Sequence, residues 1–116
     1  MEWADDAGTE ALIGRPAGRI DEEGWEAFLT AASDAIARAG KAGLPFVIDL
    51  SQVDYMSSRG LRALSLARRE ADRDGVAMVL AAPNSRTRDI LAISRYDKIF
   101  EVASTVEAAV AALVKG

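Results

Sequence analysis

The segment Pro45–Leu64, PFVIDLSQVDYMSSRGLRAL, decides the fold class. Its first six residues form an apolar run, interrupted only by Asp49, that is typical of a strand covered on both faces of a sheet. A polar loop, SQVDYMSS, follows, and apolar residues then recur at helical spacing from Arg59 to Arg73. A buried strand followed by a helix is the repeating unit of α/β domains with parallel sheets.

Similar patterns of strand and helix alternate along the rest of the 116 residues. They predict a hairpin over 1–20, a helix with an N-cap at Asp21 that ends at Gly40 or Gly43, a strand over 76–82, a helix capped by Ser85 that ends at Ile93, a strand over 98–103 and a last helix with a capping box from Ser104 to Glu107. The resulting order, ββαβαβαβα, predicts one α/β domain over residues 1–116, with a mixed, largely parallel sheet and about four helices.

The position of one strand and the contacts of the core follow from single residues. Pro16 has no amide hydrogen for a sheet ladder, so its strand is expected at an edge or beside a bulge. The predicted core consists of strand residues Val47, Ile48, Val79 and Leu80 packed against helix residues Phe28, Ile36, Leu64 and Leu113.

The chain has neither cysteine nor histidine, and its formal net charge is −4. Disulfides, thiolate chemistry, the commonest general base and the commonest metal ligand are therefore excluded. The acidic balance argues against a nucleic-acid partner, because phosphate binding favours a basic face. Neither GKAGLP nor GRPAG has the glycine spacing of a nucleotide-binding loop, so we expect no cofactor.

Asp49 and Asp54 are the carboxylates that come nearest to a catalytic pair or a magnesium site. An Asp at the end of a strand or in a loop more often accepts hydrogen bonds from the neighbouring backbone. We therefore expect no catalytic residue, no metal site and no enzyme activity.

The sequence does not predict membrane insertion. Its longest apolar runs, VAMVLAA and AAVAALV, are too short to span a bilayer. The start, MEWADDAG, is acidic and polar where a secretory signal needs a basic and then an apolar part, so the expected location is the cytoplasm.

Ser57 and Ser58 stand directly before the helix that is expected to begin at Arg59. One interpretation is structural, because a serine at the N-cap stabilises a helix by about 1 kcal/mol. The other is a phosphorylation site, because a phosphate there would meet free amide hydrogens and the positive end of the helix dipole, with Arg59 and Arg62 in reach. The residues alone leave both interpretations open.

VIDLSQVDYMSSRGLRAL resembles the signature of STAS domains, in particular of bacterial anti-sigma factor antagonists: an apolar strand, DLS, a short loop and a serine before x-G-L at a helix start. GRID, at Gly18–Asp21, resembles the G-x-[LIVF]-D that precedes the first helix of that family. Val76–Leu113, with its IF pair and closing EAAVAAL, resembles the second half of the family. The resemblance extends over residues 9–114.

This resemblance implies a phosphorylation-switched protein-binding module. The family's acceptor lies two places before the glycine of x-G-L, which is Ser58 here. Ser57 is the alternative acceptor, since it replaces the Asp of the best-known members, and Arg59 replaces the Ser or Thr that often follows. The expected docking surface consists of Asp21, Ser57, Ser58, Arg59, Gly60, Arg62, Asn84 and Ser85.

The implied partners are two proteins. An anti-sigma factor that is also a serine kinase, of the histidine-kinase-like ATPase superfamily, would bind the unphosphorylated form and so release a sigma factor. A metal-dependent protein phosphatase would restore that form. Two other functions remain open: an unphosphorylated scaffold subunit of a signalling or transporter complex, and a small-ligand or nucleotide binder that uses the same loops.

Overall fold

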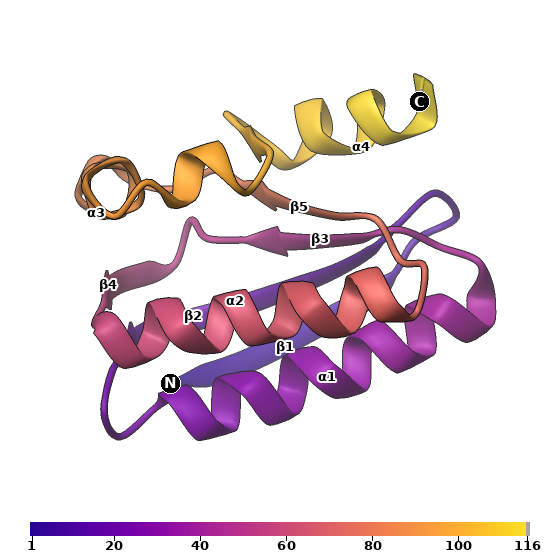
Figure 1. The fold of residues 1–116 in the computed structure, drawn as a ribbon. Helices are drawn as coiled ribbons and strands as arrows, with labels where there is room; N and C mark the ends of the chain where they lie inside the picture. The colour runs from indigo at the N-terminus through magenta and orange to yellow at the C-terminus, as the bar shows by residue number, and fades with distance from the viewer. Residues whose placement is uncertain (116) are drawn as a thin grey trace.

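The computed structural model describes residues 1–115 and places a mixed β-sheet between two layers of helices. The elements are β1 (Glu2–Ala7), β2 (Leu12–Ile20), α1 (Trp25–Ala42), β3 (Phe46–Asp49), β4 (Val53–Met56), α2 (Ser58–Arg73), β5 (Met78–Ala81), α3 (Ser85–Ile93), the 3-10 helix η1 (Tyr96–Lys98), β6 (Val102–Ala103) and α4 (Val106–Lys115). Figure 1 shows α1 and α2 side by side on one face of the sheet, with α3 and α4 on the other.

The strands follow the order β1-β2-β3-β5-β6, and β4 pairs with the last part of β2. β1 runs antiparallel to β2, and the other strand pairs of residues 1–115 are parallel. The predicted α/β domain with a mixed, largely parallel sheet is therefore confirmed.

Successive residues of the central strands point to opposite faces of the sheet, as the strand period of two requires. In β3, Phe46 and Ile48 pack with α1 and α2, whereas Val47 packs with α4. In β5, Leu80 packs with α1 and α2, whereas Val79 packs with α4. The predicted core is confirmed: Val47, Ile48, Val79, Leu80, Phe28, Ile36 and Leu64 are buried, and Leu113 is half-buried.

β2 changes its partner along its length, and Pro16 lies at the change. The amides of Leu12 and Gly18 donate to the carbonyls of Pro45 and Gln52, each at 2.9 Å, on the side of the strand that faces β3 and β4. Because alternate residues of a strand point to the same side, an amide hydrogen at position 16 would also face β3 and β4. Proline has none, and Pro16 lies between the part of β2 that pairs with β3 and the part that pairs with β4. β2 is thus an internal strand, and its proline occupies a gap two residues before a register shift.

The loop expected between Leu50 and Ser57 contains β4, a strand that was not predicted. Val53 and Met56, at the two ends of this strand, are buried, while Asp54 is exposed. β4 forms because β2 extends beyond its pairing with β3 and offers hydrogen-bonding groups there. The observed order is therefore ββαββαβαβα.

The predicted start of α1 is wrong by several residues. Asp21 caps an isolated turn, in which its Oδ1 accepts bonds from the amides of Glu23 and Gly24 at 3.1 and 3.2 Å, and the helix begins only at Trp25. The end of the helix is as predicted, since Gly43 follows it with a φ of 69°, a conformation that favours glycine.

Two other helix caps differ from the prediction by one residue. Asn84, and not Ser85, caps α3, because its Oδ1 accepts the amide of Thr87 at 2.8 Å. At α4 the capping hydroxyl belongs to Thr105 rather than to Ser104. In both cases two adjacent residues have capping side chains, and the backbone decides which of them is used.

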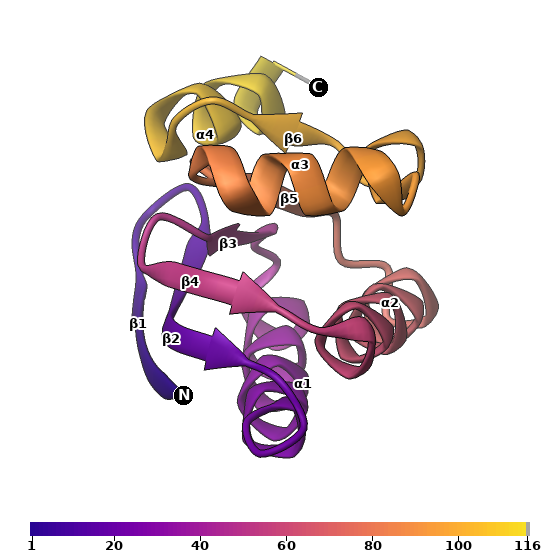
Figure 2. The same ribbon diagram turned by 90° about the vertical axis from the view of Figure 1, so that its left-hand side faces the viewer.

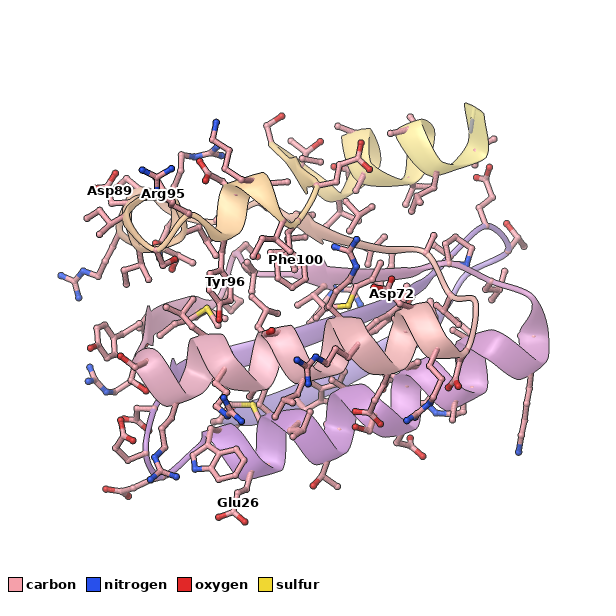
Figure 3. The ribbon with its side chains drawn as sticks, viewed as in Figure 1. Glu26, Asp72, Asp89, Arg95, Tyr96 and Phe100 are labelled. Atoms are coloured by element: carbon pink, nitrogen blue, oxygen red, sulfur yellow. The ribbon has the colours of Figure 1, made fainter. Side chains whose placement is uncertain are left out.

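The strand expected over 98–103 is also shorter than predicted. Lys98 ends the 3-10 helix η1, and Phe100 is buried in the core, so only two residues are left to pair with β5. Figure 3 shows Tyr96 and Phe100 between this segment and α2, and their rings stack at 6.1 Å.

Candidate functional site

The two serines occupy different places at the start of α2. Ser57 is the N-cap: it is 8% exposed, and its Oγ accepts a hydrogen bond from the amide of Gly60 at 3.2 Å. Ser58 is the first residue of the helix and is exposed. The prediction that one serine caps this helix is confirmed for Ser57, and the hydroxyl of Ser58 lies at the surface.

The first turn of α2 packs directly on the end of β2. The amide of Ser57 donates to the carbonyl of Ile20 at 3.0 Å. Gly60 lies so close to the same oxygen that a Cβ on it would fall 2.1 Å away. Glycine is needed at this position because of that close approach. These contacts fix where the helix begins, and hence where Ser58 is presented.

Arg59 contacts residues around the start of α1. Its Nε lies 3.1 Å from Oε2 of Glu22, and its guanidinium lies 5.8 Å from the ring centroid of Trp25. Arg59 and Glu22 are both exposed, so their ion pair contributes less than about 1 kcal/mol. Its consequence is positional, since it directs Arg59 toward α1. Arg62 is exposed and forms no salt bridge with any residue of 1–115.

Asp21 lies just after the end of β2 and is bonded within its own turn. Arg19 donates to its Oδ2 at 3.1 Å, and two backbone amides donate to its Oδ1. These bonds, with that from Arg19 the largest, lower the pKa of Asp21 below the ordinary value. Arg19 in turn lies over the ring of Tyr55, at 4.6 Å from its centroid. Asp21 is therefore a fixed anion beside the start of α2.

A groove of about 410 Å³ opens beside Ser58, between α1 and α2. We call it the α1–α2 groove. It is lined by Trp25, Ser58, Arg59, Arg62, Ala63 and Leu66. Three of these side chains are apolar, two are cationic and one carries the exposed hydroxyl, so the groove combines an apolar floor with a positive, hydroxyl-bearing rim.

Asn84 and Ser85 lie apart from this group. The side-chain amide of Asn84 donates to the carbonyl of Val53, at the start of β4, whereas Ser58 follows the end of β4. The two ends of that strand are roughly 10 Å apart. Figure 2 shows the start of α3 at the far end of β4 from α2. The other predicted docking residues gather around the first turn of α2.

Trp25, Ala63 and Leu66 line the groove but were not among the predicted site residues. Trp25 is the first residue of α1 and is half-exposed. Leu66 lies off the apolar stripe of α2 that contains Leu64 and Ala67. An apolar residue off the stripe is a weak signal for a groove, since single exposed apolar residues are common.

The carboxylate of Asp49 has a structural role. Its Oδ1 accepts the amide of Ser51 at 3.0 Å, as expected of an Asp at the end of a strand. Within the described chain, no three acidic side chains come together in a way that could hold a metal ion. Over the same residues, no helix combines the length and the apolar character needed to cross a bilayer.

Sheet, helices and site together define an α/β domain that presents one exposed serine at the start of a helix on a rigid sheet. Residues 8–109 match the sequence profile of the STAS domain. The chain therefore belongs to the STAS domain family, as its resemblance to that family predicted.

Three similar proteins illustrate this membership. BtrV of Bordetella bronchiseptica, a candidate anti-sigma factor antagonist, is 34% identical over 80 residues, which are 69% of each chain. The structure of a candidate anti-sigma factor antagonist from Thermotoga maritima superimposes with a TM-score of 0.84 at 17% identity, over 96% of this chain and 93% of that one. The Bacillus cell fate determinant SpoIIAA, in its phosphorylated form, gives a TM-score of 0.68 at 18% identity, over 97% and 99% of the two chains.

Proposed function

We propose that this protein is an anti-sigma factor antagonist whose binding to an anti-sigma factor kinase is switched off by phosphorylation of Ser58. The observation that carries the proposal is the difference between the two serines. The hydroxyl of Ser57 is buried and bonded to the amide of Gly60, whereas Ser58 is exposed on a helix fixed against the sheet. A kinase can reach Ser58 without disturbing the fold.

The relatives support the same function. BtrV is named as a candidate anti-sigma factor antagonist, and SpoIIAA has been solved in a phosphorylated form. By analogy, the unphosphorylated protein binds the kinase in the cytoplasm and displaces the sigma factor. The kinase transfers the γ-phosphoryl group of ATP to Oγ of Ser58, which loses its proton, and ADP leaves. A metal-dependent phosphatase hydrolyses the phosphoester. The domain itself supplies a surface and a hydroxyl rather than catalysis.

Charge explains why phosphorylation would end the binding. A phosphate adds about −1.5 to −2 charges at neutral pH. A kinase surface that fits a neutral hydroxyl would have to desolvate or match that dianion, which costs several kcal/mol if it is poorly paired. The folded domain tolerates the phosphate, because it lies at the first turn of α2 with Arg59 and Arg62 near it.

A pull-down from an extract of the source organism tests the proposal. Wild type and Ser58→Ala should capture the same kinase, and Ser58→Asp should capture much less of it. Ser104→Asp, which adds the same charge to an exposed serine just before another helix, is the matched control and should bind like wild type.

The captured kinase, incubated with the protein and ATP, should add one phosphate, and peptide mapping should place it on Ser58. Phosphate on Ser57, or on neither serine, would contradict the assignment. Binding of the same partner by all four proteins would instead favour an unphosphorylated scaffold.

A further inference from the structure

The α1–α2 groove beside Ser58 has the chemistry of a docking pocket. We propose that it accepts an apolar side chain of the partner kinase, with a carboxylate of the same partner segment against Arg62. This inference rests on the proposed function, since it states how the kinase is held next to the serine that it phosphorylates.

The size and lining of the groove fit one or two side chains. Its volume of about 410 Å³ lies in the range of small ligand pockets, roughly 300–1,000 Å³. Trp25 on α1 and Ala63 and Leu66 on α2 provide the apolar surface. Half-buried tryptophans of this kind are frequent binding anchors, because they offer a large apolar area at little cost in side-chain entropy.

The charges on the rim specify an acidic partner. Arg59 is paired with Glu22, and Arg68, further along α2, is paired with Asp72. Arg62 has no carboxylate partner among residues 1–115, although it lines the groove. Figure 3 shows Glu26, the acidic residue next to Trp25, projecting from α1 on the side away from α2. The planar guanidinium of Arg62 is therefore free to form a paired hydrogen bond with a carboxylate of the partner.

A second hollow on the molecule has the opposite charge. It lies between α4 and the turn that joins β1 to β2, with apolar residues Ile13, Val106 and Val110 flanked by Glu10 and Glu107. Among the side chains that the structure describes, none that lines this hollow is cationic. An apolar group that carries a carboxylate should therefore bind in the α1–α2 groove rather than in the second hollow. This holds although the second hollow is larger, with a volume of about 590 Å³ against about 410 Å³.

Phosphorylation would then act on the groove as well as on the serine. Ser58 and Arg62 are four residues apart on one helix, so their side chains lie on the same face. A phosphate on Ser58 would compete with the partner's carboxylate for Arg62. The sequence S-S-R-G-L-R thus places the switch and the docking cation within a single helical turn.

A small probe tests the groove without the kinase. In NMR titrations, 4-phenylbutyrate should shift the indole N–H signal of Trp25 and leave that of Trp3, which is bonded to Asp5, unchanged. The uncharged analogue 4-phenylbutanol should bind several-fold more weakly. Arg62→Gln should weaken the carboxylate by about three- to tenfold, since a charged hydrogen bond is lost. Arg69→Gln, about 10 Å further along the same helix, is the matched control and should change little.

The kinase provides the second readout. Arg62→Glu should weaken its binding about tenfold or more, and Arg69→Glu less than about twofold. Equal effects of the two reversals, or 4-phenylbutyrate shifts centred on Val106 and Val110, would overturn the inference. If wild type is phosphorylated on Ser58 while Arg62→Glu binds like wild type, only the groove is refuted. If no kinase binds or phosphorylates wild type, the proposed function fails and the docking inference falls with it.

Discussion

The carbonyl oxygen of Ile20 occupies the space that a side chain on Gly60 would need, since a Cβ at Gly60 would lie 2.1 Å from it. The end of β2 and the first turn of α2 are therefore joined at backbone distance. This contact and the hydrogen bond from the Ser57 amide to the same oxygen fix the position of Ser58 relative to the sheet.

Gly60→Ala should lower the free energy of unfolding by about 1–3 kcal/mol or more, because the helix start must move away from Ile20. Gly40→Ala is the matched control: its Cβ would meet Val76 at an ordinary 3.5 Å, within α1. There alanine should raise the stability by up to about 1 kcal/mol. Urea denaturation measures both, and a Gly60→Ala loss no greater than about 0.5 kcal/mol would contradict the close contact.

Alanine substitutions of Ser57 and Ser58 should have different effects on the stability of the fold. Ser57→Ala removes the cap whose Oγ accepts the amide of Gly60, and should cost about 1 kcal/mol. Ser58→Ala should change stability by less than about 0.5 kcal/mol, as expected of a surface position. Thermal and urea unfolding of the two variants give the comparison. A larger loss for Ser58→Ala would mean that the capping roles are reversed.

Leu64 should be among the most sensitive residues of α2. It is fully buried between this helix and the sheet, and Leu64→Ala should cost about 2–5 kcal/mol through lost burial and the cavity that remains. Leu66→Ala removes the same atoms from a half-buried site on the same helix and should cost clearly less. Similar losses for the two variants in chemical denaturation would show that Leu64 is not in a tightly packed core.

Asp5 should contribute stability that depends on pH. Arg38 donates to its carboxylate at 2.7 Å, and the indole of Trp3 also donates at 2.7 Å. These bonds, with that of Arg38 the larger, lower the pKa of Asp5 in the folded state. The stabilisation is therefore complete above the unfolded value of about 3.9 and is lost as the pH falls through the folded value.

Urea denaturation of wild type and Asp5→Asn from neutral to acidic pH tests this. The difference in stability between them should be constant near neutral pH and should shrink as the pH falls below about 4. Asp54→Asn is the control, since the exposed Asp54 forms no ion pair with residues 1–115. A difference between wild type and Asp5→Asn that stays the same down to strongly acidic pH would contradict the bond to Arg38.

The sequence predicted the elements whose pattern is local and strong. The apolar run of β3 and the helical stripe with Leu64 need no tertiary information to be recognised. β4 was missed because its four residues include the exposed Asp54, and it forms only where β2 extends beyond β3. The start of α1 was misplaced because Asp21 caps a turn that precedes the helix and has the same local signal.

The site was predicted in part for the same reason. Ser58, Arg59 and Arg62 lie within four residues of one another at the start of α2, so a short sequence motif contains all three. The groove needs Trp25 from another helix, and that proximity comes from the packing of α1 against α2. Asn84 follows the end of a neighbouring strand, but its bond to Val53 holds it at the opposite end of β4 from Ser58.

Isothermal titration calorimetry of the kinase with unmodified protein, and with protein that carries phosphoserine at position 58, tests the central claim most directly. Phosphoserine at 58 should weaken the affinity by about a hundredfold or more, which corresponds to about 2.7 kcal/mol, while the far-UV and near-UV circular dichroism spectra stay unchanged. Phosphoserine at 104 should have no effect on the affinity. If the kinase binds the form phosphorylated at Ser58 as tightly as the unmodified form, the charge-switch function is wrong.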